Sequence, residues 1–417
     1  MRPRLDPTSA WARSGAMALT GPADGPGLGP PAPLPERLAA IADRLAAGTA
    51  CSGLEVRLDP LALLTERAAL AGLRRQGSVS CGGSTRLVQG EDGWLAVCLA
   101  RPSDVDLVPA WLEVDRSAAG DLAATWTRVE SEVRRHPVGE LEARGAWLGL
   151  PLGALPDPPS EGPATPLGTD SDALPVTAQR LGAATATRLE RLVVADLSAL
   201  WAGPLCGRIL ADAGATVVKV ETRSRPDGAR GGPPTFFDLM NAGKASVSVD
   251  LDDRTGRATL AELVQSADVV IESSRPRALE QMGIDAEALV TTGPQVWVSV
   301  TGHGRAAGKR DRVAFGDDAA VAGGLVAWSD GRPWFCADAI ADPCSGLVAA
   351  TAVVDALETG GRWLLDVAMK DVAAHLAGPT LDAGGHRAVE PPMPASRGRG
   401  PSLGQDDERY LARRSLR

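Results

Sequence analysis

An alternation of short apolar runs with helical segments begins near residue 190, and it constrains the fold of this 417-residue chain more than any other feature. The β-branched runs are LVVADLS, TVVKVE, SVSVDL, DVVIESS and QVWVSVTG, and helical stretches such as DRTGRATLAELVQSA (253–267) lie between several of them. Strands that alternate with helices form a parallel sheet that is covered on both faces. The sequence therefore predicts an α/β fold whose ligand binds at the carboxyl ends of the strands.

The first repeat of this alternation has an unusual turn. Residues 191–221 read as strand, glycine-containing turn, helix and strand, which is how a Rossmann-like dinucleotide-binding unit begins. The turn is Trp201-Ala202-Gly203-Pro204 instead of G-x-G-x-x-G, and its proline lacks a backbone donor. A nicotinamide-dependent reductase would explain the alternating sheet but not the missing glycine fingerprint.

Composition shifts divide the chain into five predicted regions. Residues 84–100 predict a hairpin around Gly90–Gly93, and residues 59–73 have helical spacing after a capping Asp59. The regions are a remnant of a large-domain segment (1–50), a small α+β domain (51–155), a Pro/Ser/Thr/Gly-rich linker (156–188), a Rossmann-like ligand-binding domain (189–384) and an extended Pro/Gly/Arg-rich C-terminal arm (385–417).

Charge and residue usage exclude several classes of function. The net charge of −9 argues against nucleic acid as a partner, because phosphate backbones require a basic face. The longest apolar run, near 346–357, is too short to span a bilayer, and the N-terminus has no apolar signal core. The six cysteines and four histidines are scattered. We therefore expect a cytoplasmic protein with no membrane partner and no metal site.

Cations follow the second strand of the alternation. Arg223, Arg225, Arg230 and Lys244 lie within about one crossover unit, and Glu221 stands where a Rossmann enzyme places the acid that binds a ribose. Arg275 and Arg277 add cations at a third strand end. A solvated basic loop is the ordinary interpretation of any single cation, but the set together favours a phosphate-bearing ligand.

A carboxylate precedes the last long helical segment. Asp342 stands before Pro343, which is a typical start for a helix with an aspartate cap. The same carboxylate could instead act as a nucleophile, since a helix N-terminus stabilises negative charge. Asp338 is a second candidate carboxylate, and Cys344 is either a thiol nucleophile or a buried structural cysteine.

Ordered motifs over residues 191–369 resemble the class III CoA-transferases, the CaiB/BaiF group that also contains α-methylacyl-CoA racemases. After the opening segment they are PDGAR, FFDLMNAGKASVSVDLDDRTGRATL, ADVVIESSRPRALEQMGID, VWVSVTGHG, RDRVAF, ADPCSGLVAATAVVDAL and GGRWLLDVAM. The resemblance implies a Rossmann-like large domain with a smaller α+β domain, in an interlocked homodimer. It also implies that the substrates are an acyl-CoA and a carboxylic acid, with no permanently bound cofactor.

The resemblance assigns roles residue by residue. The family's nucleophilic aspartate falls on Asp342, and backbone amides at Gly82 and Gly83 become candidate oxyanion donors. A family arginine falls on Gln281, and the racemase histidine falls on Phe315, so a transferase is favoured over a racemase or isomerase. A non-catalytic CoA-binding paralogue remains an alternative. The CoA contacts implied are Trp201, Thr222, Arg223, Arg230, Lys244, Asp250, Ser273, Ser274, Arg275 and Arg312.

The order of the domains departs from the family. Residues 79–114 resemble the small domain, yet they precede the Rossmann-like unit. Residues 14–26 echo residues 323–333, and an Ala/Leu-rich helical segment follows each. We interpret residues 1–50 as what remains of an earlier large-domain copy, and this order leaves open whether Gly82 and Gly83 reach Asp342.

Overall fold

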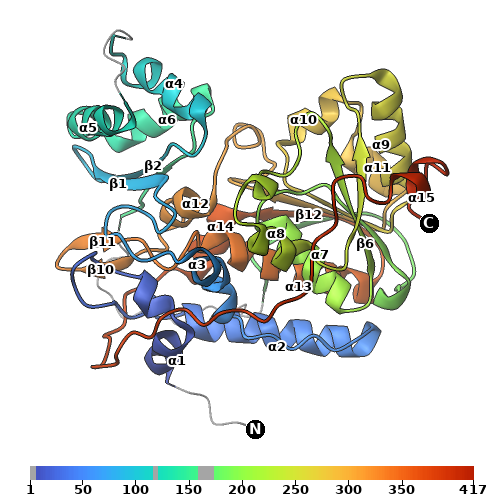
Figure 1. Cartoon of the computed structure of the whole chain (residues 1–417), viewed down its shortest axis with the longest axis horizontal. Helices are drawn as coiled ribbons and strands as arrows, with labels where there is room; N and C mark the ends of the chain where they lie inside the picture. The colour runs from blue at the N-terminus through green and yellow to red at the C-terminus, as the bar shows by residue number, and fades with distance from the viewer. Residues whose placement is uncertain (1–5, 116–120, 158–172) are drawn as a thin grey trace.

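The structure, a computed structural model, describes residues 6–115, 121–157 and 173–417. The elements before the alternating region are α1 (Pro7–Ser14), η1 (Ala16–Leu19), α2 (Leu34–Ser52), η2 (Ala62–Leu64), α3 (Glu66–Ala71), β1 (Thr85–Gln89), β2 (Trp94–Cys98), α4 (Pro102–Leu112), α5 (Leu122–Val133), α6 (Val138–Leu148) and β3 (Leu152–Ala154). They make up the blue and cyan parts of the ribbon (Figure 1).

The alternating region forms most of the second half of the chain. Its elements are β4 (Thr177–Gly182), η4 (Leu189–Arg191), β5 (Val193–Asp196), α7 (Ala202–Asp212), β6 (Thr216–Thr222), η5 (Gly228–Gly231), α8 (Pro234–Asn241), β7 (Ala245–Val249), α9 (Arg254–Ser266), β8 (Val269–Glu272), α10 (Pro276–Gln281), α11 (Ala286–Thr292), β9 (Val296–Thr301), α12 (Gly316–Ala322), β10 (Ala327–Ser329), β11 (Arg332–Trp334), α13 (Ala341–Thr359), β12 (Arg362–Ala368), α14 (Met369–Leu376) and α15 (Asp407–Leu411).

The large sheet has the strand order β4-β12-β9-β8-β5-β6-β7. Every pairing from β12 to β7 is parallel, and β4 joins β12 antiparallel at the opposite edge. Each of the five predicted β-branched runs is one of these parallel strands, so the predicted α/β fold with a parallel sheet is confirmed. The order reverses between β5 and β8, which is where ligands of such sheets bind.

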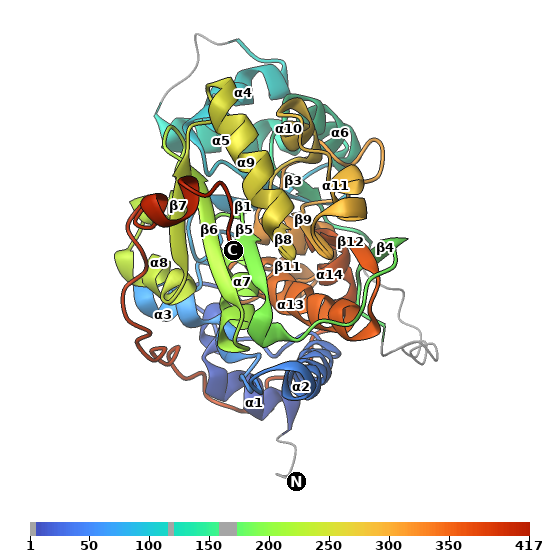
Figure 2. The ribbon, with the colours of Figure 1, turned by 90° about the vertical axis from the view of Figure 1, so that its right-hand side faces the viewer.

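Helices cover both faces of this sheet, as Figure 2 shows. In β9, Val296, Val298 and Val300 pack into the cluster that contains α7 and α13, whereas Trp297 packs with α9 and α11 on the other face. A strand that is buried on both faces is apolar at most of its positions. This burial explains why the sequence shows continuous apolar runs instead of alternation.

The N-terminal segment packs into the core of the alternating region. The helices α2 and α13 are both 19 residues long and lie against each other. Leu34, Leu38 and Leu45 of α2 share one buried cluster with Val348 of α13. The described part of this segment, residues 6–50, therefore shares the core of the alternating region.

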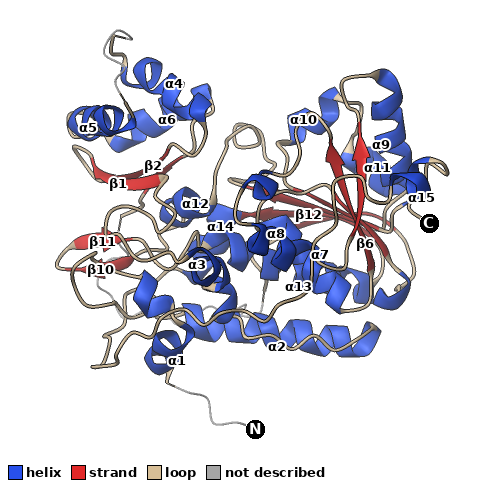
Figure 3. Cartoon of the chain, viewed as in Figure 1, coloured by secondary structure: helices blue, strands red, loops and turns tan. Residues whose placement is uncertain are grey.

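A second unit stands apart from the large sheet (Figures 1 and 3). Its sheet has the order β1-β2-β3, and α4, α5 and α6 cover it around Trp111 and Trp126. The predicted hairpin at 84–100 is confirmed as β1 and β2. The helical segment predicted over 59–73 is confirmed only in part, because Thr65 departs from helical backbone (φ −127°) and divides it into η2 and α3.

The C-terminal arm lies along its own chain. It contains no helix from residue 381 until α15. The sequence predicted the extended arm but not the short helix α15. The Asp406 and Asp407 carboxylates accept hydrogen bonds from the backbone amides of Ser246 and Ser248 in the edge strand β7. The arm thereby satisfies donors that an open sheet edge would leave unpaired. None of the helices in the described ranges is long and apolar enough to cross a membrane.

Candidate functional site

The carboxyl ends of the parallel strands meet at one edge of the large sheet, where loops from β5 and β8 come together. The Ala199 amide after β5 donates to the Ser273 Oγ after β8 at 3.2 Å. This contact bridges the reversal of strand order, where the helices α7 and α13 also begin. Trp201 is the residue that immediately precedes α7.

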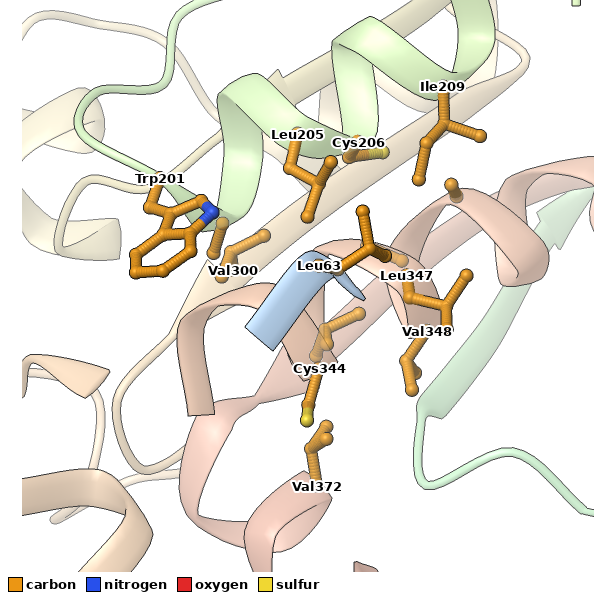
Figure 4. Close-up of a cluster of buried hydrophobic side chains, with 14 of the residues drawn as sticks. Leu63, Trp201, Leu205, Cys206, Ile209, Val300, Cys344, Leu347, Val348 and Val372 are labelled. Atoms are coloured by element: carbon orange, nitrogen blue, oxygen red, sulfur yellow. The ribbon is translucent and has the colours of Figure 1, made fainter. Parts of the chain in front are cut away.

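Trp201 is almost fully buried, with 2% of its surface exposed. Its indole meets the ring of Phe236 edge-on at 5.3 Å between centroids, and the guanidinium of Arg67 lies 5.0 Å from its centroid. Figure 4 shows Trp201 beside Val300, in a cluster where Leu63 lies between α7 and α13. The indole Nε1 is buried and has no hydrogen-bond partner in the protein.

Asp342 occupies the second position of α13, since that helix begins at Ala341. No side chain caps this helix end, so the interpretation of Asp342 as a plain N-cap is wrong. The residue is half-buried, and a Cβ at Gly316 would collide with the Asp342 Oδ2 atom. The carboxylate thus lies between the first turn of α13 and the start of α12, where the helix N-terminus favours negative charge.

Four residues before Asp342, the loop that leads into α13 is strained. Ala337 and Ala339 both have left-handed backbone, with φ of 54° and 43°. Such conformations cost roughly 1 kcal/mol or more for a non-glycine residue and persist only where surrounding contacts hold them. Asp338 between them is fully buried, and its two oxygens accept a bidentate pair from Arg67 at 2.8 and 2.5 Å.

The carboxylates of Asp317, Asp338 and Asp342 all interact with the guanidinium of Arg67. Burial, reinforced by Asp317 and Asp338 and opposed by Arg67, raises the pKa of Asp342 to about 7. Burial and the charge of Asp338 also raise the pKa of Asp317 to about 6. Asp317 accepts a hydrogen bond from the Ala339 amide at 3.1 Å. Groups whose ionisation is shifted in this way are common in active sites.

The predicted glycine loop reaches the same place despite the altered domain order. The Cys81 Sγ donates to the Ala337 carbonyl at 3.4 Å, and a Cβ at Gly82 would lie 3.4 Å from Arg67 Nη2. Gly82 and Gly83 are exposed, and Gly83 has a φ of 80° that favours glycine. The loop is therefore beside the Asp338 loop, although no hydrogen bond joins either glycine to Asp342.

Two of the predicted phosphate-binding cations prove to be internal ion pairs. Lys244 is buried, and its ammonium donates to the Asp196 carboxylate at 2.8 Å, so it presents no charge to a ligand. Arg230 forms an ion pair with Glu221 at 2.6 Å and stacks on Phe237. The same pair occupies Glu221, so this carboxylate is not free to bind a ribose. Lys244 and Arg230 are therefore not the free phosphate-binding cations that the sequence predicted, and Glu221 is not a free ribose-binding acid.

Other predicted contacts lie at the strand ends with more exposure. The Arg223 side chain is 65% exposed, donates through Nε to the Ser248 Oγ and pairs with Asp407 at 2.9 Å. Arg312 pairs with Glu142 of α6 at 2.8 Å, which ties the second unit to the large one. The remaining predicted contacts, Thr222, Asp250, Ser274 and Arg275, are half-buried or exposed at the carboxyl ends of β6, β7 and β8.

The alternative in which Cys344 is a thiol nucleophile gains no support. Cys344 is 1% exposed, and burial raises the pKa of its thiol well above the ordinary value, so it is a structural residue in the cluster of Figure 4. Within the described residues, no group of three or more His, Cys, Asp or Glu side chains could hold a metal ion.

Sequence reasoning missed two members of this group. Arg67 lies 271 positions from its partner Asp338, and only the fold brings them together. Asp317 had a signal, because Asp317 and Asp318 are adjacent acids inside the apolar stretch VAFGDDAAVAGG. Paired acids in an apolar stretch either bind something or sit at a functional site, since burial of a charge is costly.

Comparison with known proteins identifies relatives of the second half of the chain. The chain is 31% identical over 207 residues to succinate–glutarate CoA-transferase from Agrobacterium fabrum, covering 44% of this chain and 51% of that one. It is 32% identical over 185 residues to succinyl-CoA–D-citramalate CoA-transferase from Chloroflexus aurantiacus, covering 42% and 46%. The matches thus span about half the length of these relatives.

A solved structure of a CAIB/BAIF family protein from Brucella suis shares 31% identity, with a TM-score of 0.41 over 45% of this chain and 54% of that one. The profile described as CoA-transferase family III matches residues 189–403, which is more than half of the chain. This chain belongs to CoA-transferase family III, as its ordered motifs predicted.

Proposed function

We propose that this protein transfers CoA from an acyl-CoA to a carboxylic acid through covalent intermediates on Asp342. The observation that carries the proposal is the position of Asp342 at the start of α13, beside two further carboxylates, Arg67 and the glycine loop. A pKa of about 7 leaves a substantial ionised fraction at neutral pH. Desolvation of a carboxylate also makes it a better nucleophile than in water.

The reaction proceeds by four balanced acyl exchanges. An oxygen of Asp342 attacks the thioester carbonyl, and CoA thiolate leaves to give a mixed anhydride. The thiolate then attacks the aspartyl carbonyl carbon and releases the first acid as a carboxylate, which leaves an aspartyl-CoA thioester. The incoming carboxylate attacks that thioester and expels the thiolate. The thiolate finally attacks the acyl carbon of the new anhydride, which frees Asp342 and the new acyl-CoA.

Each tetrahedral intermediate carries an oxyanion that needs donors. The amide of Gly82, next to Arg67, is a candidate for this role, whereas the Gly83 amide already donates to the Ser80 carbonyl at 2.8 Å. The N-terminus of α13 adds favourable potential at the same point. Anhydrides hydrolyse readily, so burial of the loop around Asp338 serves to limit water.

The bound CoA would lie across the carboxyl edge of the sheet. The parallel order from β7 to β12 is typical of a Rossmann-like domain, with its ligand crevice between β5 and β8. Arg223, Arg275 and the serines after β8 remain the candidate contacts for the phosphates. The interlocked homodimer and the absence of a permanent cofactor are further parts of this proposal that come from the family resemblance, and the cytoplasmic location comes from the composition and cysteine usage of the chain.

The test is a transfer assay with a panel of acyl-CoAs and isotope-labelled carboxylic acids, in which mass spectrometry detects the new acyl-CoA. We expect a labelled acyl-CoA to form from at least one pair. A chiral acyl-CoA that loses its configuration without transfer would assign the racemase branch. Calorimetric binding of CoA without any turnover would assign a non-catalytic paralogue, and binding of NADH but not CoA would return the reductase alternative.

A further inference from the structure

Arg67 connects three features of the candidate site. Its Nε and Nη2 atoms donate to both oxygens of Asp338, and its Cζ atom lies over the indole of Trp201, 5.0 Å from the ring centroid. Its Nη2 atom also lies next to Gly82. Bidentate geometry orients a carboxylate more firmly than a single hydrogen bond does. Arg67 therefore ties α3, the glycine loop and the start of α7 to the loop before Asp342.

The loop around Asp338 has a strained backbone that needs contacts with other residues to keep its conformation. Ala337 and Ala339 flank Asp338 with left-handed backbone. The Ala337 amide donates to Thr20 Oγ1 at 3.0 Å, and the Ala339 carbonyl accepts from the Asp342 amide at 2.9 Å. The backbone of Ala339 is thus common to the strained turn and to the first turn of α13. A movement of Asp338 would consequently shift Asp342.

The charges around Asp342 are unbalanced without Arg67. Asp317 and Asp318 face it from α12, Asp338 faces it from the preceding loop, and Cys344 follows on its own helix. The Cys81 thiol donates to the carbonyl of Ala337, the residue before Asp338, and interacts with the charges of Asp338 and Asp317. Arg67 is the cation that acts on this acidic group, and its interactions reach Asp338, Asp317 and Asp342.

Arg67 comes from outside the segment that matches the family, since α3 precedes residue 189 by more than a hundred positions. We propose that Arg67 is a positioning residue that fixes the Asp338 loop and keeps Asp342 ionised, so that the N-terminal half of the chain completes a site otherwise built by the family domain. This inference deepens the proposed function and rests on it for the role of Asp342 as nucleophile. The structural part concerns ionisation and can be tested without turnover.

The experiment titrates the Asp342 carboxyl by ¹³C NMR in the full chain labelled at aspartate Cγ, with the signal assigned by its loss in Asp342→Asn. In the wild type we expect a midpoint of about 7. In Arg67→Gln we expect the midpoint to rise by about one pH unit or more, because a neighbouring cation is lost. Arg67→Lys should bring it back to within about half a unit, since the charge remains while the bidentate geometry is lost.

Arg86→Gln is the matched control. Arg86 also pairs with a carboxylate, Glu130 at 2.9 Å, and stacks on an indole, Trp126 at 4.5 Å, but it lies in the second unit. Its substitution should leave the Asp342 midpoint unchanged. An unchanged midpoint in folded Arg67→Gln would overturn the proposal, and so would a shift of equal size in Arg86→Gln. If Arg67→Gln does not fold, an Arg67→Lys midpoint more than about one unit above the wild type also contradicts it.

A second measurement separates this inference from the proposed function. The pH profile of transfer should move upward with the NMR midpoint in Arg67→Gln, and its rate in Arg67→Lys should fall about tenfold or more even at optimal pH, because the loop is less well positioned. If the NMR midpoint rises in Arg67→Gln but the wild type transfers no CoA, the proposed function is contradicted and the electrostatic role of Arg67 stands. If the wild type transfers CoA but the Asp342 midpoint is the same in Arg67→Gln, the role of Arg67 is contradicted and the proposed function stands.

Discussion

The ends of β6 and β7 and the start of α13 are built from the same charged residue types, yet their balance of charge is opposite. At the strand ends, cations meet carboxylates of the same chain: Lys244 with Asp196, Arg230 with Glu221 and Arg223 with Asp407. At α13, Asp317, Asp338 and Asp342 share Arg67. Ion pairs with equal numbers of opposite charges stabilise the fold, whereas a group with more carboxylates than cations contains acids whose pKa is shifted, as in many active sites. The comparison shows that much of the cation cluster is structural, and it is consistent with our proposal that the chemistry lies at α13.

Lys244→Met should have the largest effect, and it should be on stability. The substitution leaves Asp196 buried and without its main partner. Although burial disfavours the charged carboxylate, Lys244 and Lys219 hold the pKa of Asp196 below its ordinary value. Removing one member of a buried pair typically costs about 3–5 kcal/mol. Chemical denaturation measures the loss; a stable Lys244→Met variant that fails only to bind CoA would restore Lys244 as a ligand contact.

Asp342→Asn should have an intermediate effect on the free energy of unfolding, and the difference from the wild type should depend on pH. The pKa of Asp342 is about 7 in the folded chain, against an ordinary value of 3.8, so ionising it in the folded state costs stability. The wild type should lose stability relative to the variant as pH rises from about 4 to 7, by at most about 1.4 kcal/mol for each unit of pKa difference. Thermal melts of both proteins at pH 4.5 and pH 8 test this; a variant that is equally destabilised at both pH values would contradict it.

Asp407→Asn should have the smallest effect, and it should be a gain. The asparagine oxygen can still accept from the Ser248 amide, so α15 should stay docked. The loss of charge frees Arg223, whose exposed pair with Asp407 contributes little to stability. We expect CoA to bind about threefold more tightly at low salt, with the gain disappearing at high salt. Calorimetry at two salt concentrations measures it, and Arg223→Ala as the opposite change should weaken binding.

The sheet could be predicted because its strands are buried on both faces, and such strands are visible in the sequence as apolar runs. Asp342 could be proposed as the nucleophile because local features, an acid before a proline and a helix, coincide with a family motif. Lys244 could not be assigned correctly, because a lysine in a surface loop and a lysine that caps a buried aspartate look alike along the chain. Arg67 could not be found at all, since its role depends on a contact across 271 positions that leaves no local pattern.

The most direct test of the account is the site of covalent capture. The wild type and Asp342→Asn would each be incubated with a reactive acyl-CoA and hydroxylamine, digested, and mapped by mass spectrometry. Asparagine is close in size to aspartate but cannot form an anhydride, so the variant separates chemistry from packing. We predict an aspartyl hydroxamate on the peptide that contains residue 342 in the wild type and none in the variant, which should also lose transfer. A hydroxamate on Asp338, or a variant that still transfers CoA at a near-normal rate, would remove Asp342 from the mechanism.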